Sequence, residues 1–145
     1  MSLLTWTEEF YPKEARECVG SNLEMLEHSI RKWRGAIPAN MGKHGLKHSA
    51  GPMVMDRENL STFAFNCQTC ALCQVYRMED TVVQPDCTGC PLNEMFGEPC
   101  CYSSPDPYAV FVSTGNPQPM IEALTKCLEI ETSLTEAKLN QQEKE

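Results

Sequence analysis

The sequence predicts a mainly α-helical protein with little β structure, in which helices pack around a small cysteine-rich module. Two observations indicate the helices: apolar residues recur every three or four positions in residues 21–34 and again in 117–128. A third observation places the module, because seven of the nine cysteines fall between Cys67 and Cys101. A chain of 145 residues with 41% hydrophobic residues suits one compact unit with a modest core.

Composition divides this unit into four regions. Residues 1–60 are predicted to form a helical region with a basic loop, and residues 61–105 form the cysteine-rich module. Residues 106–131 are predicted to be helical again. Residues 132–145 are polar and are expected to fray.

The N-terminal region is expected to contain a short helix and then a longer one. The short helix is placed over residues 7–15, with Gly20 closing it. The longer helix opens at Ser21, which has capping-box spacing to Glu24, and it ends at Gly35. We expect its apolar stripe to pack on the cysteine-rich module or on the C-terminal helix, and His28 to face solvent on the polar side. The stripe consists of Leu23, Leu26, Ile30 and Trp33.

Glycines and prolines punctuate residues 35–55, which are therefore predicted to be loop. His44 and His48 have the i,i+4 spacing of helical metal ligands, but the glycines around them favour a solvated loop. A short strand or hairpin fits residues 80–84.

Two elements are expected after the cysteine-rich module. A short helix with Asp106 as N-cap and Pro107 in its first turn competes with an extended strand over the same residues. The last helix is placed from residues 116–117 onwards. The side chains predicted to be buried by these two elements are Tyr108, Val110, Phe111, Ile121, Leu124 and Leu128, with Cys127 as a further candidate.

The cysteine spacing predicts a zinc site. Two Cys-x-x-Cys pairs separated by a loop can hold one ion tetrahedrally, with two thiolates on each side. The preferred ligands are Cys70, Cys73, Cys87 and Cys90. Cys67, Cys100 and Cys101 are alternates, and one or two ions can be accommodated. The spacing does not fit a ferredoxin-type iron–sulfur run, and so many clustered thiols argue against simple apolar packing.

Charge narrows the possible partners. The formal net charge of −8 comes entirely from residues 61–145, and between residues 61 and 119 the only formal cation is Arg77. A module that approaches nucleic acid normally needs cations against phosphate repulsion. A basic segment elsewhere offers an alternative nucleic-acid surface, although a solvated helix end and loop is the favoured interpretation. That segment contains Arg31, Lys32, Trp33, Arg34, Lys43 and Lys47.

No catalytic motif is found, and no small-molecule substrate is evident. A site of four thiolates leaves no coordination position for water, so a structural zinc in a non-enzymatic protein is the favoured interpretation. There is no membrane-length apolar stretch and no signal peptide, and the cysteines suit a reducing compartment. A cytoplasmic location is therefore expected. The roles of Cys18, Cys127 and the Cys100–Cys101 pair are left open.

Several of these segments resemble small cysteine-rich proteins encoded by bacteriophages and prophages. The resemblance lies in residues 26–33, 70–73, 87–92, 107–108 and 120–124. Cys67 and the doubling at Cys100–Cys101 are additions to that pattern. The resemblance implies a viral setting, with the host cytoplasm as location, and a bound metal; it implies no mechanism.

Three hypotheses of function follow. The first is a zinc-stabilised phage accessory protein that binds and modulates a host protein through its acidic C-terminal half. The second is a nucleic-acid-binding zinc protein that uses the basic segment. The third is an enzyme, either a metallo-hydrolase or a thiol redox protein, which requires an open coordination position or reactive thiols.

Overall fold

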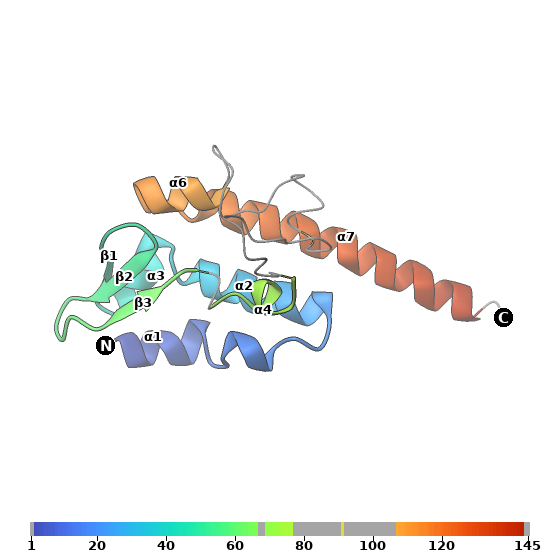
Figure 1. The fold of residues 1–145 in the computed structure, drawn as a ribbon, viewed down its shortest axis with the longest axis horizontal. Coiled ribbons are helices and arrows are strands. Elements are labelled where there is room, and N and C mark those ends of the chain that lie inside the picture. The colour runs from blue at the N-terminus through green and yellow to red at the C-terminus, as the bar shows by residue number, and fades with distance from the viewer. Residues whose placement is uncertain (1, 67–68, 77–90, 92–106, 144–145) are drawn as a thin grey trace, which may run out of the picture.

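The computed structural model describes residues 2–66, 69–76, 91 and 107–143. These residues are mainly helical and carry a small antiparallel sheet, which confirms the predicted mainly α class with little β structure (Figure 1). The elements in chain order are α1 (Leu3–Phe10), the 3-10 turn η1 (Ala15–Glu17), α2 (Asn22–Arg34), α3 (Pro38–Lys43), β1 (Leu46–His48), β2 (Met53–Asp56), β3 (Thr62–Ala64), α4 (Ala71–Tyr76), α6 (Pro107–Thr114) and α7 (Gln118–Glu143).

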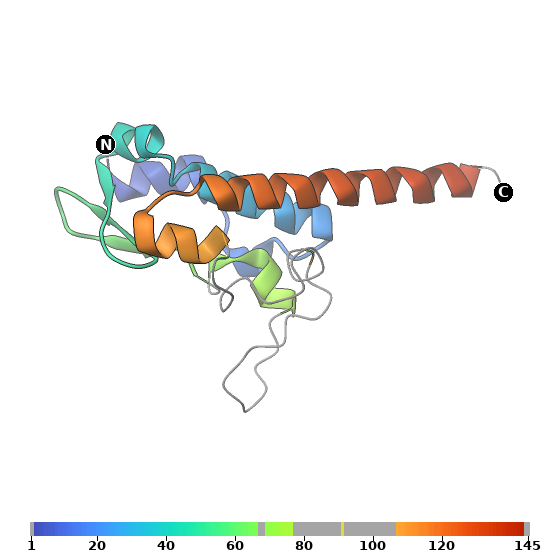
Figure 2. The same cartoon turned by 90° about the horizontal axis from the view of Figure 1, so that it is seen from above.

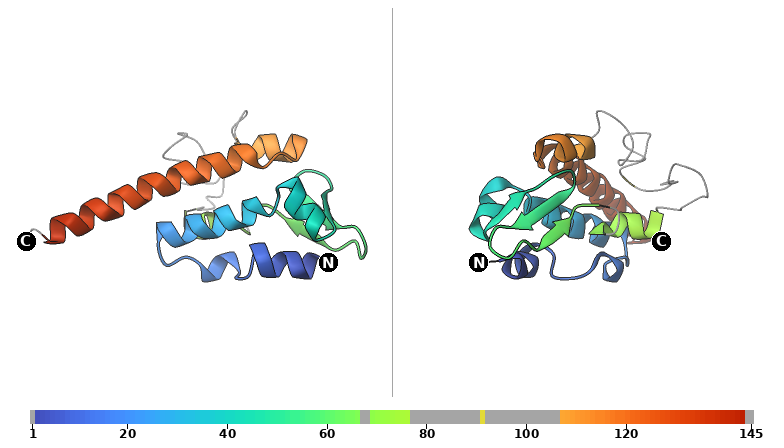
Figure 3. Two further views of the ribbon diagram at one scale, coloured as in Figure 1. Left: turned by 180° about the vertical axis from the view of Figure 1, so that it is seen from behind. Right: turned by 60° about the vertical axis from the view of Figure 1, so that its left-hand side comes forward.

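Helix α2 is the centre of the arrangement. Helices α1 and α7 lie on opposite sides of it, and α4 packs on a third side (Figures 1 and 2). The sheet and α3 lie at one end, and α6 folds back against the start of α7. The C-terminal part of α7 projects beyond the rest of the described residues (Figure 3).

Helix α1 begins earlier than the sequence pattern predicts. Ser2 is its N-cap: the Ser2 hydroxyl accepts a hydrogen bond from the Thr5 amide at 3.3 Å, and the Thr5 hydroxyl accepts one from the Ser2 amide at 2.9 Å. A threonine thus completes a capping box that is usually completed by glutamate or glutamine. The prediction of a helix over residues 7–15 is wrong, because only a 3-10 turn forms after Phe10.

Helix α2 begins and ends where the sequence predicts. The Ser21 hydroxyl accepts a hydrogen bond from the Glu24 amide at 3.1 Å, as expected of an N-cap. The Glu24 carboxylate accepts from the Gly20 amide at 3.2 Å, one residue before the cap. The helix packs against α7, the C-terminal helix, and against α4, in the described part of the cysteine-rich module. Both elements named in the prediction therefore contact α2.

The prediction that residues 35–55 form a loop is wrong. They contain α3, β1 and most of β2. Strands β1, β2 and β3 form an antiparallel sheet in that order, with Val54 opposite His48 and Phe63. Each strand has only three or four residues, which is too short for an alternating pattern to stand out. Gly45 and Gly51 adopt positive φ angles of 75° and 56° in the turns, which explains the loop-like composition.

The C-terminal helices agree with the predictions in part. Helix α6 confirms the helical alternative over the strand and buries Phe111, while Asp106 and the hairpin expected at residues 80–84 lie outside the described residues. Helix α7 buries Ile121, Leu124 and Cys127. It continues to Glu143, so the tail predicted to fray is helical.

An aromatic cluster forms the core between the sheet and helices α1, α2 and α6. Trp6 packs on Phe63 and Phe65 with ring centroids 4.9 and 5.9 Å apart. Trp33 contacts Phe65 at 4.9 Å and Phe111 at 4.8 Å. These rings give the described residues a hydrophobic core of their own, in addition to any metal.

Replacing Gly35 with alanine should destabilise this core. A Cβ at Gly35 would lie 2.6 Å from a Trp6 ring carbon and 2.8 Å from a Phe10 ring carbon, so both rings must move. We expect a loss of about 1–3 kcal/mol in the free energy of unfolding, measured with urea. The control is Gly42→Ala. Gly42 lies in α3, and a Cβ at this position would meet nothing within 4 Å. The control should be neutral or stabilising by roughly 0.5–1 kcal/mol; equal losses in both variants would contradict the packing argument.

Candidate metal centre

Cys70 immediately precedes α4 and Cys73 lies in its first turn, where α4 packs on α2. Between them, Ala71 and Leu72 are fully buried, so the first turn of α4 is fixed against the core. A side-chain hydrogen bond from Cys73, the nearby Lys32 ammonium and the Cys73 backbone lower the pKa of Cys70 to about 5. Burial alone would raise it. Cys70 therefore has the thiolate character that a metal ligand needs.

Helix α2 supplies two further groups to these sulfur atoms. The Ser29 hydroxyl oxygen lies 3.9 Å from the Cys70 sulfur. The Lys32 ammonium donates to the carbonyl oxygen of Thr69, the residue before Cys70, at 2.9 Å. No pattern in the sequence predicts these contacts, because Ser29 and Lys32 are polar residues beside the apolar stripe.

The other cysteines divide into two groups. Cys67, Cys87, Cys90, Cys100 and Cys101 lie outside the described residues. Cys18 and Cys127 are described and buried; desolvation raises the pKa of both, and that of Cys127 to about 11. Neither thiol shares the lowered pKa of Cys70.

Only one arm of the predicted zinc site is thus described. Among residues 2–66, 69–76, 91 and 107–143, no three His, Cys, Asp or Glu side chains come together to hold a metal ion. The chemistry of the described arm fits the metal, since the Cys70 and Cys73 side chains interact and the pKa of Cys70 is lowered to about 5. The full ligand set, and the choice between one ion and two, stays a prediction.

His28 is buried, which corrects the expectation that it faces solvent. Its side chain is 9% exposed and packs edge-on against Tyr11, with ring centroids 5.0 Å apart. Nε2 donates to the Lys13 carbonyl oxygen at 2.8 Å, and Nδ1 has no hydrogen-bond partner. The segment that follows α1 therefore covers this side of α2, and the buried arc of the helix is wider than one apolar stripe.

Replacing His28 with glutamine should make the protein less sensitive to acid. Burial lowers the pKa of His28, so the unfolded chain takes up a proton below about pH 6.5 that the folded chain resists. Stability is therefore lost as the pH falls through this range. Thermal unfolding between about pH 7.5 and 5.5 should show a smaller drop in Tm for His28→Gln, whose amide can still donate to Lys13. An unchanged drop would show that other groups control the acid sensitivity.

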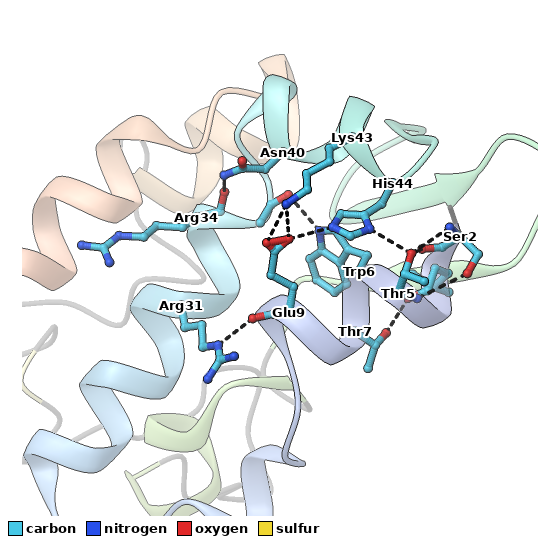
Figure 4. Close-up of polar contacts among 12 residues, drawn as sticks. Ser2, Thr5, Trp6, Thr7, Glu9, Arg31, Arg34, Asn40, Lys43 and His44 are labelled. Carbon is cyan, nitrogen blue, oxygen red and sulfur yellow. Dashed lines mark hydrogen bonds and ion pairs between the residues drawn. The ribbon is translucent and has the colours of Figure 1, made fainter.

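The basic segment lies only partly at the surface. Lys32 is 1% exposed and Trp33 is 3% exposed, so neither reaches a partner at the surface. Lys43 forms an ion pair with Glu9 at 3.0 Å, and the Arg31 Nε donates to the Glu9 carbonyl oxygen at 2.6 Å (Figure 4). Arg34 and Lys47, the two other cations of the segment, are exposed.

The prediction that His44 and His48 lie in a solvated loop is wrong. His44 directly follows α3 and His48 lies in β1. His44 is buried, with Nε2 2.8 Å from a Glu9 carboxylate oxygen and Nδ1 2.8 Å from the Thr5 hydroxyl (Figure 4). The hydrogen bonds from His44 and Lys43 lower the pKa of Glu9. His48 donates to the Gly51 carbonyl at 2.8 Å and packs on Phe111. Each imidazole thus has a structural role at the sheet end of the molecule.

Comparisons with known proteins identify no relative. No protein-family model, curated protein or solved structure matches the chain. The resemblance to phage-encoded cysteine-rich proteins therefore stays a prediction. Among the described residues, no helix has both the length and the apolar composition needed to cross a bilayer.

Proposed function

We propose that this chain is a zinc-stabilised, non-enzymatic accessory protein, encoded by a phage, that binds and modulates a host protein through an acidic surface. The observation that carries the metal part is the Cys70–Cys73 pair, whose Cys70 sulfur packs against the core, lies 3.9 Å from the Ser29 hydroxyl and has a lowered pKa. The partner part rests on the distribution of charge and on the shape of α7. Both parts can be tested separately.

The zinc would be held by Cys70 and Cys73 together with Cys87 and Cys90. Four thiolates fill a tetrahedral site, so the ion would serve to fix the chain and not to activate water. Cys67, Cys100 and Cys101 are the alternates if one of these four is not a ligand. Elemental analysis and native mass spectrometry of the purified chain should find one zinc, or two if the alternates build a second site; a folded chain without metal would contradict the proposal.

The projecting part of α7 is the acidic surface that the structure describes best. Beyond Cys127, its side chains are mostly exposed, and they include Glu129 and Glu136. Ile130 is 49% exposed and Leu134 is 51% exposed, one helical turn apart. An acidic helix with two apolar anchors suits an apolar groove edged by basic residues. We propose such a groove on a host protein as the binding site.

The partner proposal is tested by affinity capture from host lysate. The tagged chain should retain a stoichiometric protein at low salt and lose most of it near about 1 M salt, where the Debye length is ~3 Å. The variant Glu129→Gln/Glu136→Gln should retain clearly less. Its control is Glu8→Gln/Glu58→Gln, which removes the same charge from exposed positions elsewhere. Capture of no protein, or equal capture by both variants, would contradict the acidic surface on α7.

The nucleic-acid alternative gains no support from the geometry. Two of its six residues are buried, and Lys43 is paired with Glu9. Gel shifts with duplex and single-stranded probes should therefore show no tight binding. Tight binding that is lost in a variant with Arg31, Arg34, Lys43 and Lys47 replaced by glutamine would reverse this ranking.

A further inference from the structure

Lys32 is a charged side chain in an unusual place. Its side chain is 1% exposed, and its ammonium lies 2.9 Å from the Thr69 carbonyl oxygen and 3.3 Å from the Thr69 hydroxyl. The rings of Trp33 and Phe65 lie 5.4 and 5.6 Å from it. Burying an ammonium group costs several kcal/mol unless nearby groups compensate its charge. The surroundings of Lys32 should therefore contain negative charge.

The residue after Thr69 can supply this negative charge. Thr69 immediately precedes Cys70, and the Lys32 ammonium interacts electrostatically with the Cys70 sulfur. Thr69 is itself fixed, because its hydroxyl donates to the Ala64 carbonyl at 2.7 Å and accepts from the Asn66 amide at 3.2 Å. The fold thus holds the Lys32 ammonium at the residue that precedes Cys70.

We propose that Lys32 is a positioning residue of the metal centre, whose buried ammonium offsets the negative charge of the thiolates and raises their affinity for Zn²⁺. This inference rests on the proposed zinc site. Four thiolates on one Zn²⁺ leave two excess negative charges, which are costly beside a hydrophobic core. The ammonium group of Lys32 offsets one of these two negative charges. Groups next to the ligands commonly change metal affinity by about 10–100-fold.

The test separates the charge of Lys32 from its hydrogen bond. In Lys32→Gln the amide can still donate to the Thr69 carbonyl, but the charge is gone; Lys32→Arg keeps the charge. The matched control is Lys43→Gln, which removes a half-exposed cation paired with Glu9 on another part of the molecule. Zn²⁺ affinity is measured by competition with a chromophoric chelator, and Co²⁺ spectra report how many thiolates bind.

Lys32→Gln should bind Zn²⁺ about tenfold or more weakly, with an unchanged cobalt–thiolate spectrum. Lys32→Arg should recover most of the affinity, and Lys43→Gln should match the wild type. Equal affinity in Lys32→Gln and wild type would overturn the inference and leave the zinc site intact. Failure of the wild type to bind either metal would overturn both proposals. If Lys32→Gln does not fold, Lys32→Arg decides alone: because it keeps the charge, a Zn²⁺ affinity more than about tenfold below that of the wild type would also overturn the inference.

Discussion

Replacing Cys70 with serine is expected to remove the metal and to lower the free energy of unfolding by at least about 3–5 kcal/mol, the usual cost of removing one partner of a buried charge pair. The serine hydroxyl is not ionised at neutral pH, so it is a poor zinc ligand. It also leaves the buried Lys32 ammonium without the thiolate beside it. Zinc in small modules contributes roughly 10–16 kcal/mol of binding free energy, much of which becomes folding free energy. The measurement is chemical unfolding together with zinc content.

The control for this prediction is Cys127→Ser. Cys127 is also buried, but burial and Glu131 raise its pKa to about 11, so it is not a thiolate. This variant should keep its full zinc content and lose only about 1–3 kcal/mol, the cost of burying a hydroxyl in place of a thiol. A strong chelator should lower the Tm of the wild type and of Cys127→Ser, and should leave that of Cys70→Ser unchanged. If the chelator has no effect on the wild type, the metal does not stabilise the fold.

The parts of the fold that are determined by neighbouring residues could be predicted from the sequence. The apolar stripe and the Ser21 N-cap of α2 depend only on nearby residues. The cap is confirmed, and so is the stripe except at Leu23, which is half-buried. The sheet could not be predicted, because strands of three residues gain their stability from pairing with distant segments. The early start of α1 could not be predicted, because the usual capping-box pattern has glutamate or glutamine three residues after the N-cap. Here Thr5 stands at that position after Ser2.

For the candidate site, the sequence predicts cysteine ligands but not the groups around them. The spacing of Cys70 and Cys73 is visible in the sequence, and the structure brings these two sulfurs together. The groups that surround them are not visible in this way. Ser29 and Lys32 become part of the site only because α4 packs on α2, a contact between residues about forty positions apart. A lysine adjoining a buried stripe is normally solvated, so its burial has no local signal.

Replacing Trp33 with alanine should lower the free energy of unfolding by about 3–5 kcal/mol, the usual range for deleting a buried tryptophan side chain. Trp33 is enclosed by Phe65 and Phe111, so its loss leaves a cavity where α2, the sheet and α6 meet. Urea unfolding measures the loss, and Lys47→Ala, at an exposed position, should stay within roughly 0.5 kcal/mol of the wild type.

The same variant separates two interpretations of the basic segment. A tryptophan that stacks on bases is exposed in the free protein, so its removal would weaken nucleic-acid binding by about 1–3 kcal/mol and leave stability nearly unchanged. A core tryptophan gives the opposite result, with a large loss of stability. The ring contacts of Trp33 predict the second outcome. A stable Trp33→Ala protein would therefore contradict the packing of α2 and restore the basic segment as a candidate surface.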